Sequence, residues 1–207
     1  MSLFKLDPRR YRTPLERLRP WFKTRTGVLL HARLMKPADA PLLVGLYHRL
    51  SPESLYRRFH TALNDLPPDV VMERVAHLAD VDNLAVSGAV MALLPAEKGR
   101  RPERRQQEEL IGVVRLARDP HTPDSPDAEA AIVVRDDFHG MGVGQELMRR
   151  MVLLARRMKI QIIVATFQPE NEEAIRLFRK LGLPYTIEHH HGETTMRITV
   201  PNGTEIS

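Results

Sequence analysis

The sequence predicts an α/β protein built around one mixed β-sheet. Residues 143–158 place apolar side chains at helical spacing, whereas residues 160–168, IQIIVATFQ, form the nearly continuous apolar run of a strand that is covered on both faces. Helical and strand-like patterns also alternate along the chain, which is typical of this class. At 207 residues the chain is long enough for one domain with a substantial core.

Four elements are predicted before residue 80. They are a strand at 27–35, an amphipathic helix at 39–50, a helix that begins at residue 52, and a helix at 68–78. The segment Ser51-Pro52-Glu53 places a hydroxyl, a proline and an acid where the start of a helix favours them. The expected buried face of this helix consists of Leu55, Tyr56 and Phe59.

The remaining elements continue the alternation. They are strands at 83–94, 109–117, 129–135 and 160–168, helices at 143–158 and from 172 onward, and short strands at 185–188 and 194–200. Asn171 is a suitable cap for the last helix, and Gly182 is a suitable residue to end it. The charged stretch PAEKGRRPERRQQEE between two strands is predicted to be a hairpin excursion.

The basic character of the chain is concentrated in its first 25 residues. The net charge is +5, yet residues 1–25 carry eight Lys and Arg against Asp7 and Glu16, so the rest of the chain sums to −1. We therefore expect a basic N-terminal extension, 1–25, followed by one domain, 26–207. Nucleic acid, an acidic partner and the surface of the domain are alternative contacts for this extension, and a solvated or loosely docked extension is the commoner outcome.

Several classes of chemistry and location are excluded by composition. Without cysteine there is no disulfide, no thiolate nucleophile and no cysteine-ligated metal. The stretch MSLFKLDPRRYRTP lacks the features of a secretory leader, and no apolar run approaches the roughly 20 residues of a membrane helix. We expect a cytoplasmic protein with no membrane partner. No metal is expected either, because three consecutive histidines, 189–191, cannot all face one ion.

Gly140, Gly142 and Gly144 alternate where a strand leads into the helix at 143–158. Glycines let the chain turn tightly and let a ligand approach the unpaired N–H groups of a helix start, which together form a nest for an anion such as a phosphate. The spacing differs from the G-x-G-x-x-G of dinucleotide-binding folds, and the lysine of a P-loop is absent. An ordinary tight turn is the alternative.

These glycines are part of two longer motifs. The segment from His139 to Gly144 resembles the Q/R-x-x-G-x-G/A signature of the GNAT acyltransferase superfamily, and NEEAIRLFRKLGL (171–183) is similar to its second motif, N-x-x-A-x-x-L-Y-x-K-L-G-F. The stretches LSPESLYRRF, HLADVD, LIGVVRL and AEAAIVVRDDFHGMGVGQELM resemble the acetyltransferase domain of Pat-type bacterial protein lysine acetyltransferases. The resemblance covers roughly residues 27–200.

The resemblance implies a GNAT fold and an acetyl-CoA site. In this fold a mixed, mostly antiparallel sheet of six to seven strands is flanked by about five helices, and the strands at 129–135 and 160–168 splay apart to form the cleft for acetyl-CoA. A backbone N–H near the end of strand 129–135 would hold the thioester oxygen. The implied cofactor-binding residues are Ile132 and Val134 for the pantetheine arm, His139, Gly140, Met141, Gly142, Val143, Gly144 and Gln145 for the diphosphate, and Asn171 and Phe178.

Glu129 is the candidate general base. With no cysteine nucleophile, the acceptor amine would attack the thioester directly, and it must first lose the proton that a lysine holds with a pKa of about 10.4. Glu129 opens the strand that carries the thioester, and a surface glutamate is the alternative. Asp127 is the reserve, because a β-bulge would decide which carboxylate faces the cleft. Phe178 stands where many relatives have a tyrosine acid, so the acid step stays open, with Tyr185 as another hydroxyl.

Three functions are compatible with these residues. We expect acetyl transfer to a lysine of a protein, and the alternatives are transfer to a small amine and a non-catalytic acyl-CoA sensor. The sequence does not determine the oligomeric state, and a homodimer is one alternative. Asp136 and Asp137 precede the nest and are expected to orient the loop or to pair with Arg149 and Arg150.

Overall fold

A computed structural model describes residues 15, 18–59, 68–81, 83–96, 108–190 and 192–201. Its strands are β1 (Trp21–Lys23), β2 (Leu29–Leu34), β3 (Ser87–Leu94), β4 (Glu109–Ala117), β5 (Asp127–Val134), β6 (Ile162–Phe167), β7 (Tyr185–His190) and β8 (Glu193–Thr199). Its helices are α1 (Ala40–Tyr47), α2 (Pro52–Phe59), α3 (Pro68–His77), α4 (Val143–Arg157) and α5 (Glu172–Arg179). Short 3-10 turns, Pro37–Asp39 and Asp136–Phe138, precede α1 and the glycine loop.

The strands form one sheet in the order β1-β2-β3-β4-β5-β6-β8-β7, and every neighbouring pair is antiparallel except β5 and β6. The sheet has eight strands, so the expected six to seven was too low. The added strand is β1, which pairs with β2 through Trp21 and His31 and lies inside the segment predicted as a basic extension. A three-residue edge strand among charged residues has too little alternation to be recognised from sequence.

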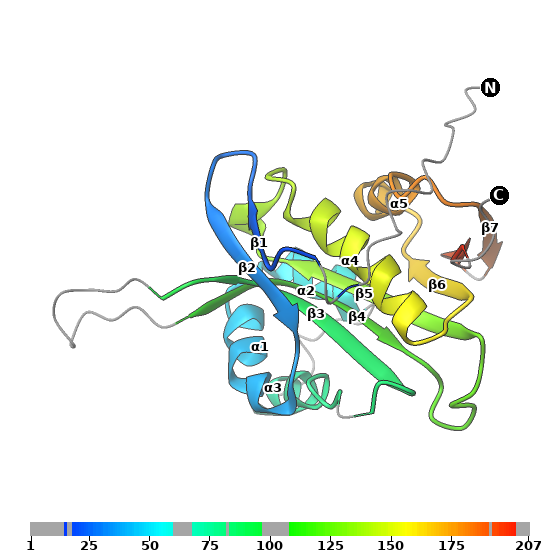
Figure 1. The fold of residues 1–207 in the computed structure, drawn as a ribbon, viewed down its shortest axis with the longest axis horizontal. Coiled ribbons are helices and arrows are strands. Elements are labelled where there is room, and N and C mark those ends of the chain that lie inside the picture. The colour runs from blue at the N-terminus through cyan, green and yellow to red at the C-terminus, as the bar shows by residue number, and fades with distance from the viewer. Residues whose placement is uncertain are drawn as a thin grey trace, which may run out of the picture.

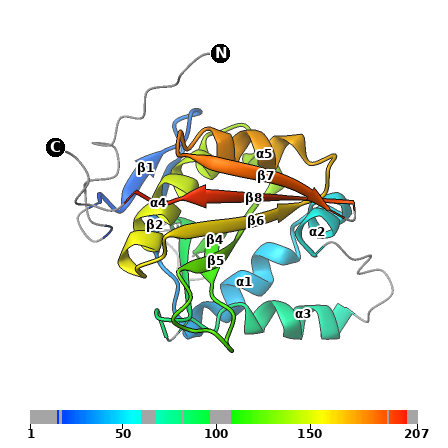
Figure 2. The same cartoon turned by 90° about the vertical axis from the view of Figure 1, so that its right-hand side faces the viewer.

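Each face of the sheet is covered by helices (Figures 1 and 2). On one face α4 packs against β3 and β4, and its buried side chains form one core with α5 and the C-terminal strands. On the other face α1 packs over β4 and α3 packs against α1, with a second core that includes Leu46, Tyr47 and Val75. Covering both faces explains why the central strands are almost wholly apolar.

The end of one helix and the burial of one side chain differ from the prediction. The helix expected at 39–50 ends at Tyr47, although Leu50 is still buried in the second core. In α2 the N-cap is confirmed, since the hydroxyl of Ser51 accepts a hydrogen bond from the backbone N–H of Ser54 at 3.2 Å. Tyr56 was expected to be buried but is 47% exposed, whereas Leu55 packs against the core.

Some predictions fall outside the described residues. The predicted hairpin excursion after β3 lies mostly at 97–107, the N-terminal part of the basic extension at 1–14, and the last of the three consecutive histidines at 191. No helix among the described residues is both long and apolar enough to cross a lipid bilayer.

Candidate active site

A cleft of about 750 Å³ opens where β5 and β6 diverge. The two strands pair only at three positions, from Asp127 with Ile162 to Glu129 with Val164. Beyond Glu129, β5 stays paired with β4 as far as Val134, whereas β6 stays paired with β8 as far as Phe167. The splayed strands predicted for the site are therefore present, and Glu129 lies at the point of divergence.

The free edge of β5 presents backbone polar groups to this cleft. The N–H of Arg135 donates to the carbonyl of Ile111 at 2.8 Å, so residue 135 belongs to a hydrogen-bonded pair of the β4–β5 ladder. Because such pairs alternate along an antiparallel ladder, the peptide groups of Ala130, Ile132 and Val134 point away from β4 and toward the gap. These are the groups that strand addition by an extended ligand requires.

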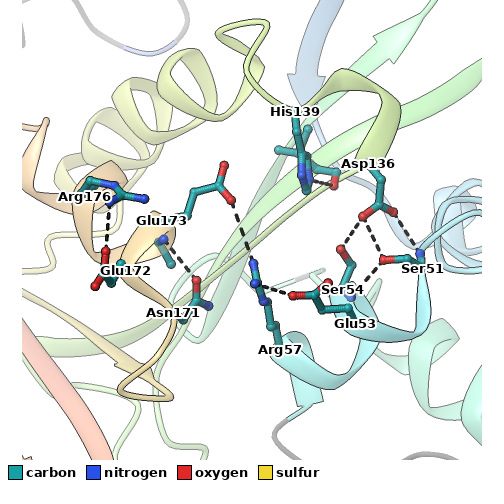
Figure 3. Close-up of polar contacts among 12 residues, drawn as sticks. Ser51, Glu53, Ser54, Arg57, Asp136, His139, Asn171, Glu172, Glu173 and Arg176 are labelled. Carbon is teal, nitrogen blue, oxygen red and sulfur yellow. Dashed lines mark hydrogen bonds and ion pairs between the residues drawn. The ribbon is translucent and has the colours of Figure 1, made fainter.

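His139 already contacts one of these groups. Its Nε2–H donates to the carbonyl oxygen of Val134 at 2.8 Å, across the turn between β5 and α4 (Figure 3). One lone pair of that carbonyl is thus engaged, whereas the N–H of Val134 has no such contact with the ring. The side chain of His139 is exposed and lines the cleft.

The three glycines have separate roles at the start of α4. Gly140 (φ +71°) and Gly142 (φ +88°) adopt the left-handed conformation that other residues rarely take, and Gly142 is the N-cap of the helix. Gly144 lies in the first turn, where an added Cβ would come 3.3 Å from Leu177 of α5. The first two glycines therefore shape the loop, and the third allows α4 and α5 to approach. The space around Gly140 is open, so an anion can reach the unpaired N–H groups of the helix start.

Arg25 lies against the same loop and was missed by the sequence analysis. Its backbone N–H donates to the carbonyl of Met141 at 2.9 Å, and its guanidinium donates to the carbonyl of Gly140 at 3.2 Å. The chain reaches this position because β1 and β2 form a hairpin at the edge of the sheet. Arg25, the last residue of the predicted basic extension, thus lines the cleft.

Of the two candidate bases, only Glu129 lines the cleft. Its side chain is exposed rather than partly buried, which differs from what we expected of a base at this strand. Asp127 instead forms an ion pair with Arg197 of β8. The register of β5 with β4 is continuous over its paired residues, and the irregularity of the sheet lies between Ala92 and Leu93 of β3.

Asp136 ties α2 to the loop before the glycines. Its carboxylate accepts hydrogen bonds from the N–H of Ser51 at 2.9 Å, the hydroxyl of Ser51 at 3.0 Å and the hydroxyl of Ser54 at 2.6 Å (Figure 3). Burial alone would raise the pKa of Asp136, but these hydrogen bonds lower it below its usual range. Of the two expected alternatives, Asp136 and Asp137 orient the loop, since Asp137 pairs with Arg135, whereas Arg149 and Arg150 form ion pairs with Glu146.

The far wall of the cleft comes from α5. Asn171 caps this helix as predicted, since its side-chain oxygen accepts from the N–H of Ala174 at 3.2 Å. Phe178 is 2% exposed and meets Phe167 edge-on, with ring centroids 5.1 Å apart. Arg57 of α2 points toward Glu173 of α5, with 3.9 Å between the charged groups (Figure 3).

Most of the predicted site residues meet at this cleft. Those that line it are Glu129, Ile132, Val134, His139, Gly140, Gly142, Gly144, Gln145, Asn171 and Phe178. Met141 and Val143 do not line it, because Val143 is fully buried in the core and Met141 packs against that core. Tyr185 is 44% exposed on the edge strand β7 and is also outside the lining. Sequence reasoning missed Ser54, Arg57 and Glu193, which come to the cleft from distant segments.

His189 and His190 are the last two residues of β7. The Nδ1 atom of His189 lies 2.9 Å from the hydroxyl of Thr194 on the neighbouring strand. Within the described part of the chain, no group of three His, Cys, Asp or Glu side chains is arranged to hold a metal ion.

Comparison with known proteins shows what this chain is similar to. Residues 88–183 match the model of the Acetyltransferase (GNAT) family. The chain is 25% identical over 166 residues to Acetyltransferase Pat of Mycolicibacterium smegmatis, a match that covers 80% of this chain and 44% of that protein. The chain therefore spans less than half the length of this curated relative.

Solved structures show the same fold. The GNAT domain of S. lividans PAT superposes with a TM-score of 0.69 at 24% identity, covering 86% of this chain and 95% of that one. A protein from Salmonella typhimurium, solved with its cofactor acetyl-CoA, gives a TM-score of 0.57 at 18% identity, covering 83% of this chain and 94% of that one. The predicted GNAT fold is confirmed, with one strand more than the upper expected count.

Proposed function

We propose that this chain transfers an acetyl group from acetyl-CoA to a primary amine, because residues 88–183 match the model of the Acetyltransferase (GNAT) family. The observation that carries this proposal is the cleft itself, in which the free edge of β5 runs directly into the glycine-shaped start of α4. An extended arm with an anion at one end fits this arrangement. Acetyl-CoA has such a shape, and it is the cofactor named for the Salmonella typhimurium relative.

The backbone would hold the cofactor at two places. The N–H groups at the start of α4, from Gly142 onward, face the diphosphate and carry the partial positive charge of the helix end. The peptide groups of Ile132 and Val134 add the pantetheine arm to the sheet as a further strand. The N–H of Val134 is the donor for the thioester oxygen, which gains negative charge during the reaction.

Glu129 is the proposed general base. It lies at the point where β5 and β6 separate, and its carboxylate is exposed to the cleft. It takes a proton from the ammonium of the acceptor, directly or through one water, and the neutral amine then attacks the thioester carbon. A C–N bond forms, the C–S bond breaks and the sulfur leaves as a thiolate, while the second amine proton passes to solvent. Holding amine and thioester together supplies much of the remaining rate.

No side chain of this chain needs to protonate the leaving sulfur. Phe178 stands where relatives place a tyrosine, and its ring is buried against Phe167. A free thiol has a pKa of about 8.5, so a thiolate is a tolerable leaving group near neutral pH.

We further propose that the acceptor amine belongs to a lysine of a protein. Two similarities support this acceptor, one to Acetyltransferase Pat and one to the GNAT domain of S. lividans PAT. Glu129 lines the cleft where β5 and β6 separate, and its carboxylate favours a cationic side chain at that point. Small amines are the competing acceptors.

The test is an acetylation assay with two sets of acceptors. The protein is incubated with acetyl-CoA and either a mixture of lysine-containing proteins or a panel of polyamines and amino acids. Release of the CoA thiol measures turnover, and mass spectrometry locates the acetyl group. We expect acetylated lysines on protein. Turnover only with small amines would replace the acceptor, whereas CoA binding without turnover on any acceptor would indicate a sensor.

A further inference from the structure

The turn between β1 and β2 docks on the glycine loop. Besides the two hydrogen bonds from Arg25 to Gly140 and Met141, the hydroxyl of Thr26 lies 3.6 Å from the sulfur of Met141. A Cβ atom added to Gly142 would lie 3.6 Å from the Cγ of Arg25. The arginine therefore covers the loop at Gly142, the residue that caps α4.

The guanidinium of Arg25 has donors left for a ligand. It carries five N–H groups, and one of them donates to the carbonyl of Gly140. The side chain is exposed, lines the cleft and forms no ion pair with a carboxylate in the part of the chain that the structure describes. Arg57 and Arg176 also line the cleft, but Glu53 and Glu172 neutralise them.

We propose that Arg25 binds the diphosphate of CoA, together with the backbone N–H groups at the start of α4; this inference rests on the proposed function. A guanidinium matches phosphate oxygens with two parallel hydrogen bonds, and such charged bonds are among the stronger ones in proteins. The helix end supplies only partial charge, and the guanidinium of Arg25 adds a full positive charge beside it. Arg25 lies outside residues 88–183, the part that matches the family model.

This assignment extends the cofactor site to the N-terminal hairpin. The backbone contact with Met141 fixes the position of Arg25 whatever its side chain does, so a substitution of the side chain removes the guanidinium without detaching the turn. Lys23 provides the matched control, because it is exposed on β1, two residues away, carries the same charge and does not line the cleft.

The test is calorimetric titration of the whole chain with CoA and with dephospho-CoA, which keeps the diphosphate and lacks the 3′-phosphate. We expect Arg25→Gln to weaken both ligands by the same factor, about tenfold or more, as the loss of a charged hydrogen bond implies. Lys23→Gln leaves both affinities unchanged. Arg25→Lys recovers only part of the loss, since lysine lacks the planar fork. Between about 50 mM and about 500 mM salt, the affinity of the wild type falls more steeply than that of Arg25→Gln.

Several results would overturn the assignment. Unchanged affinity in Arg25→Gln removes Arg25 from the site, and a loss confined to CoA places the guanidinium on the 3′-phosphate. A weaker affinity with an unchanged salt dependence shows that Arg25 only supports the loop. If the wild type binds neither ligand, the proposed function itself fails, and that outcome is recognised without any variant.

Discussion

The hydroxyl of Ser54 donates a 2.6 Å hydrogen bond to the carboxylate of Asp136, and this bond joins α2 to the loop that precedes the glycines. Ser54 and Arg57 both project from α2 into the cleft (Figure 3). One side chain, Asp136, thus holds α2 to the loop that precedes the glycines.

Substituting Asp136 should lower stability. In Asp136→Asn one oxygen becomes an N–H₂ group that faces the donors of Ser51 and Ser54, so at least one hydrogen bond is lost. We expect the free energy of unfolding to fall by about 1–3 kcal/mol in urea at neutral pH. Asp137→Asn is the control, because its ion pair with Arg135 involves a 61% exposed carboxylate and is worth about 0–1 kcal/mol. Equal losses in both variants would contradict this role.

The protein should lose stability in mild acid. Hydrogen bonds lower the pKa of four carboxyl groups in the folded state. Asp39 is bound by Arg33, and Glu109 is bound by Arg49 and Arg135. For Asp136 and Glu146, burial raises the pKa, but the hydrogen bonds from the serines and from Arg149 lower it. A lowered pKa stabilises the fold above the unfolded-state value of about 4, and this contribution is lost as the pH falls through the folded value.

Urea unfolding between pH 7 and pH 3 measures this effect. We expect the difference in unfolding free energy between the wild type and Asp136→Asn to shrink below a pH of about 4. Protonation of Asp136 removes its charge and turns one acceptor oxygen into a hydroxyl group, so the wild type then also loses part of this interaction. A difference that stays constant down to pH 3 would show that the charge of Asp136 does not matter.

Replacing Glu129 should remove turnover and spare the cofactor. Glu129→Gln keeps the size of the side chain and loses its ability to accept a proton. We expect turnover at saturating acetyl-CoA to fall by about a hundred- to ten-thousandfold, with the dissociation constant of CoA unchanged. Thiol release measures the first quantity and calorimetry the second.

Asp127→Asn is the matched control for this change, two residues earlier on the same strand. This change breaks the ion pair with Arg197. The side chain of Asp127 is 32% exposed and that of Arg197 is 40% exposed, so stability should fall by no more than about 1 kcal/mol. Turnover should persist. If Asp127→Asn abolishes turnover and Glu129→Gln does not, the base is assigned to the wrong carboxylate.

Gly142 should not tolerate a side chain. Its φ of +88° is left-handed, which costs other residues about 1–2 kcal/mol, so Gly142→Ala should lower thermal stability and weaken CoA binding together. Gly45→Ala is the control, since Gly45 lies within α1 with open space around it, and alanine there should stabilise the protein by about 0.5–1 kcal/mol. A Gly142→Ala variant with unchanged CoA affinity would show that the loop can bind without its left-handed cap.

Local patterns predicted the elements that position the site. The bounds of β4 were predicted without error and those of α4 within one residue, because α4 carries one apolar face and β4 an apolar run between charged loops. The cap by Asn171 and the left-handed Gly182 at the end of α5 also follow from residue type alone.

Contacts between distant segments could not be predicted in the same way. Arg25 reaches the glycine loop only because β1 and β2 pair at the edge of the sheet, and a three-residue strand leaves no pattern. Asp136 meets Ser54 across 82 positions of the chain, so neither residue indicates the other. Glu193 comes to the cleft from β8, whose place beside β6 follows from the strand order.

The most direct test is a crystal structure of the chain with CoA. We expect the diphosphate oxygens within about 2.7–3.2 Å of the backbone N–H groups at the start of α4, and the pantetheine amides paired with the free edge of β5 at Ile132 and Val134. A CoA molecule bound elsewhere, with the N–H groups after Gly142 facing only water, would contradict the proposed cofactor site.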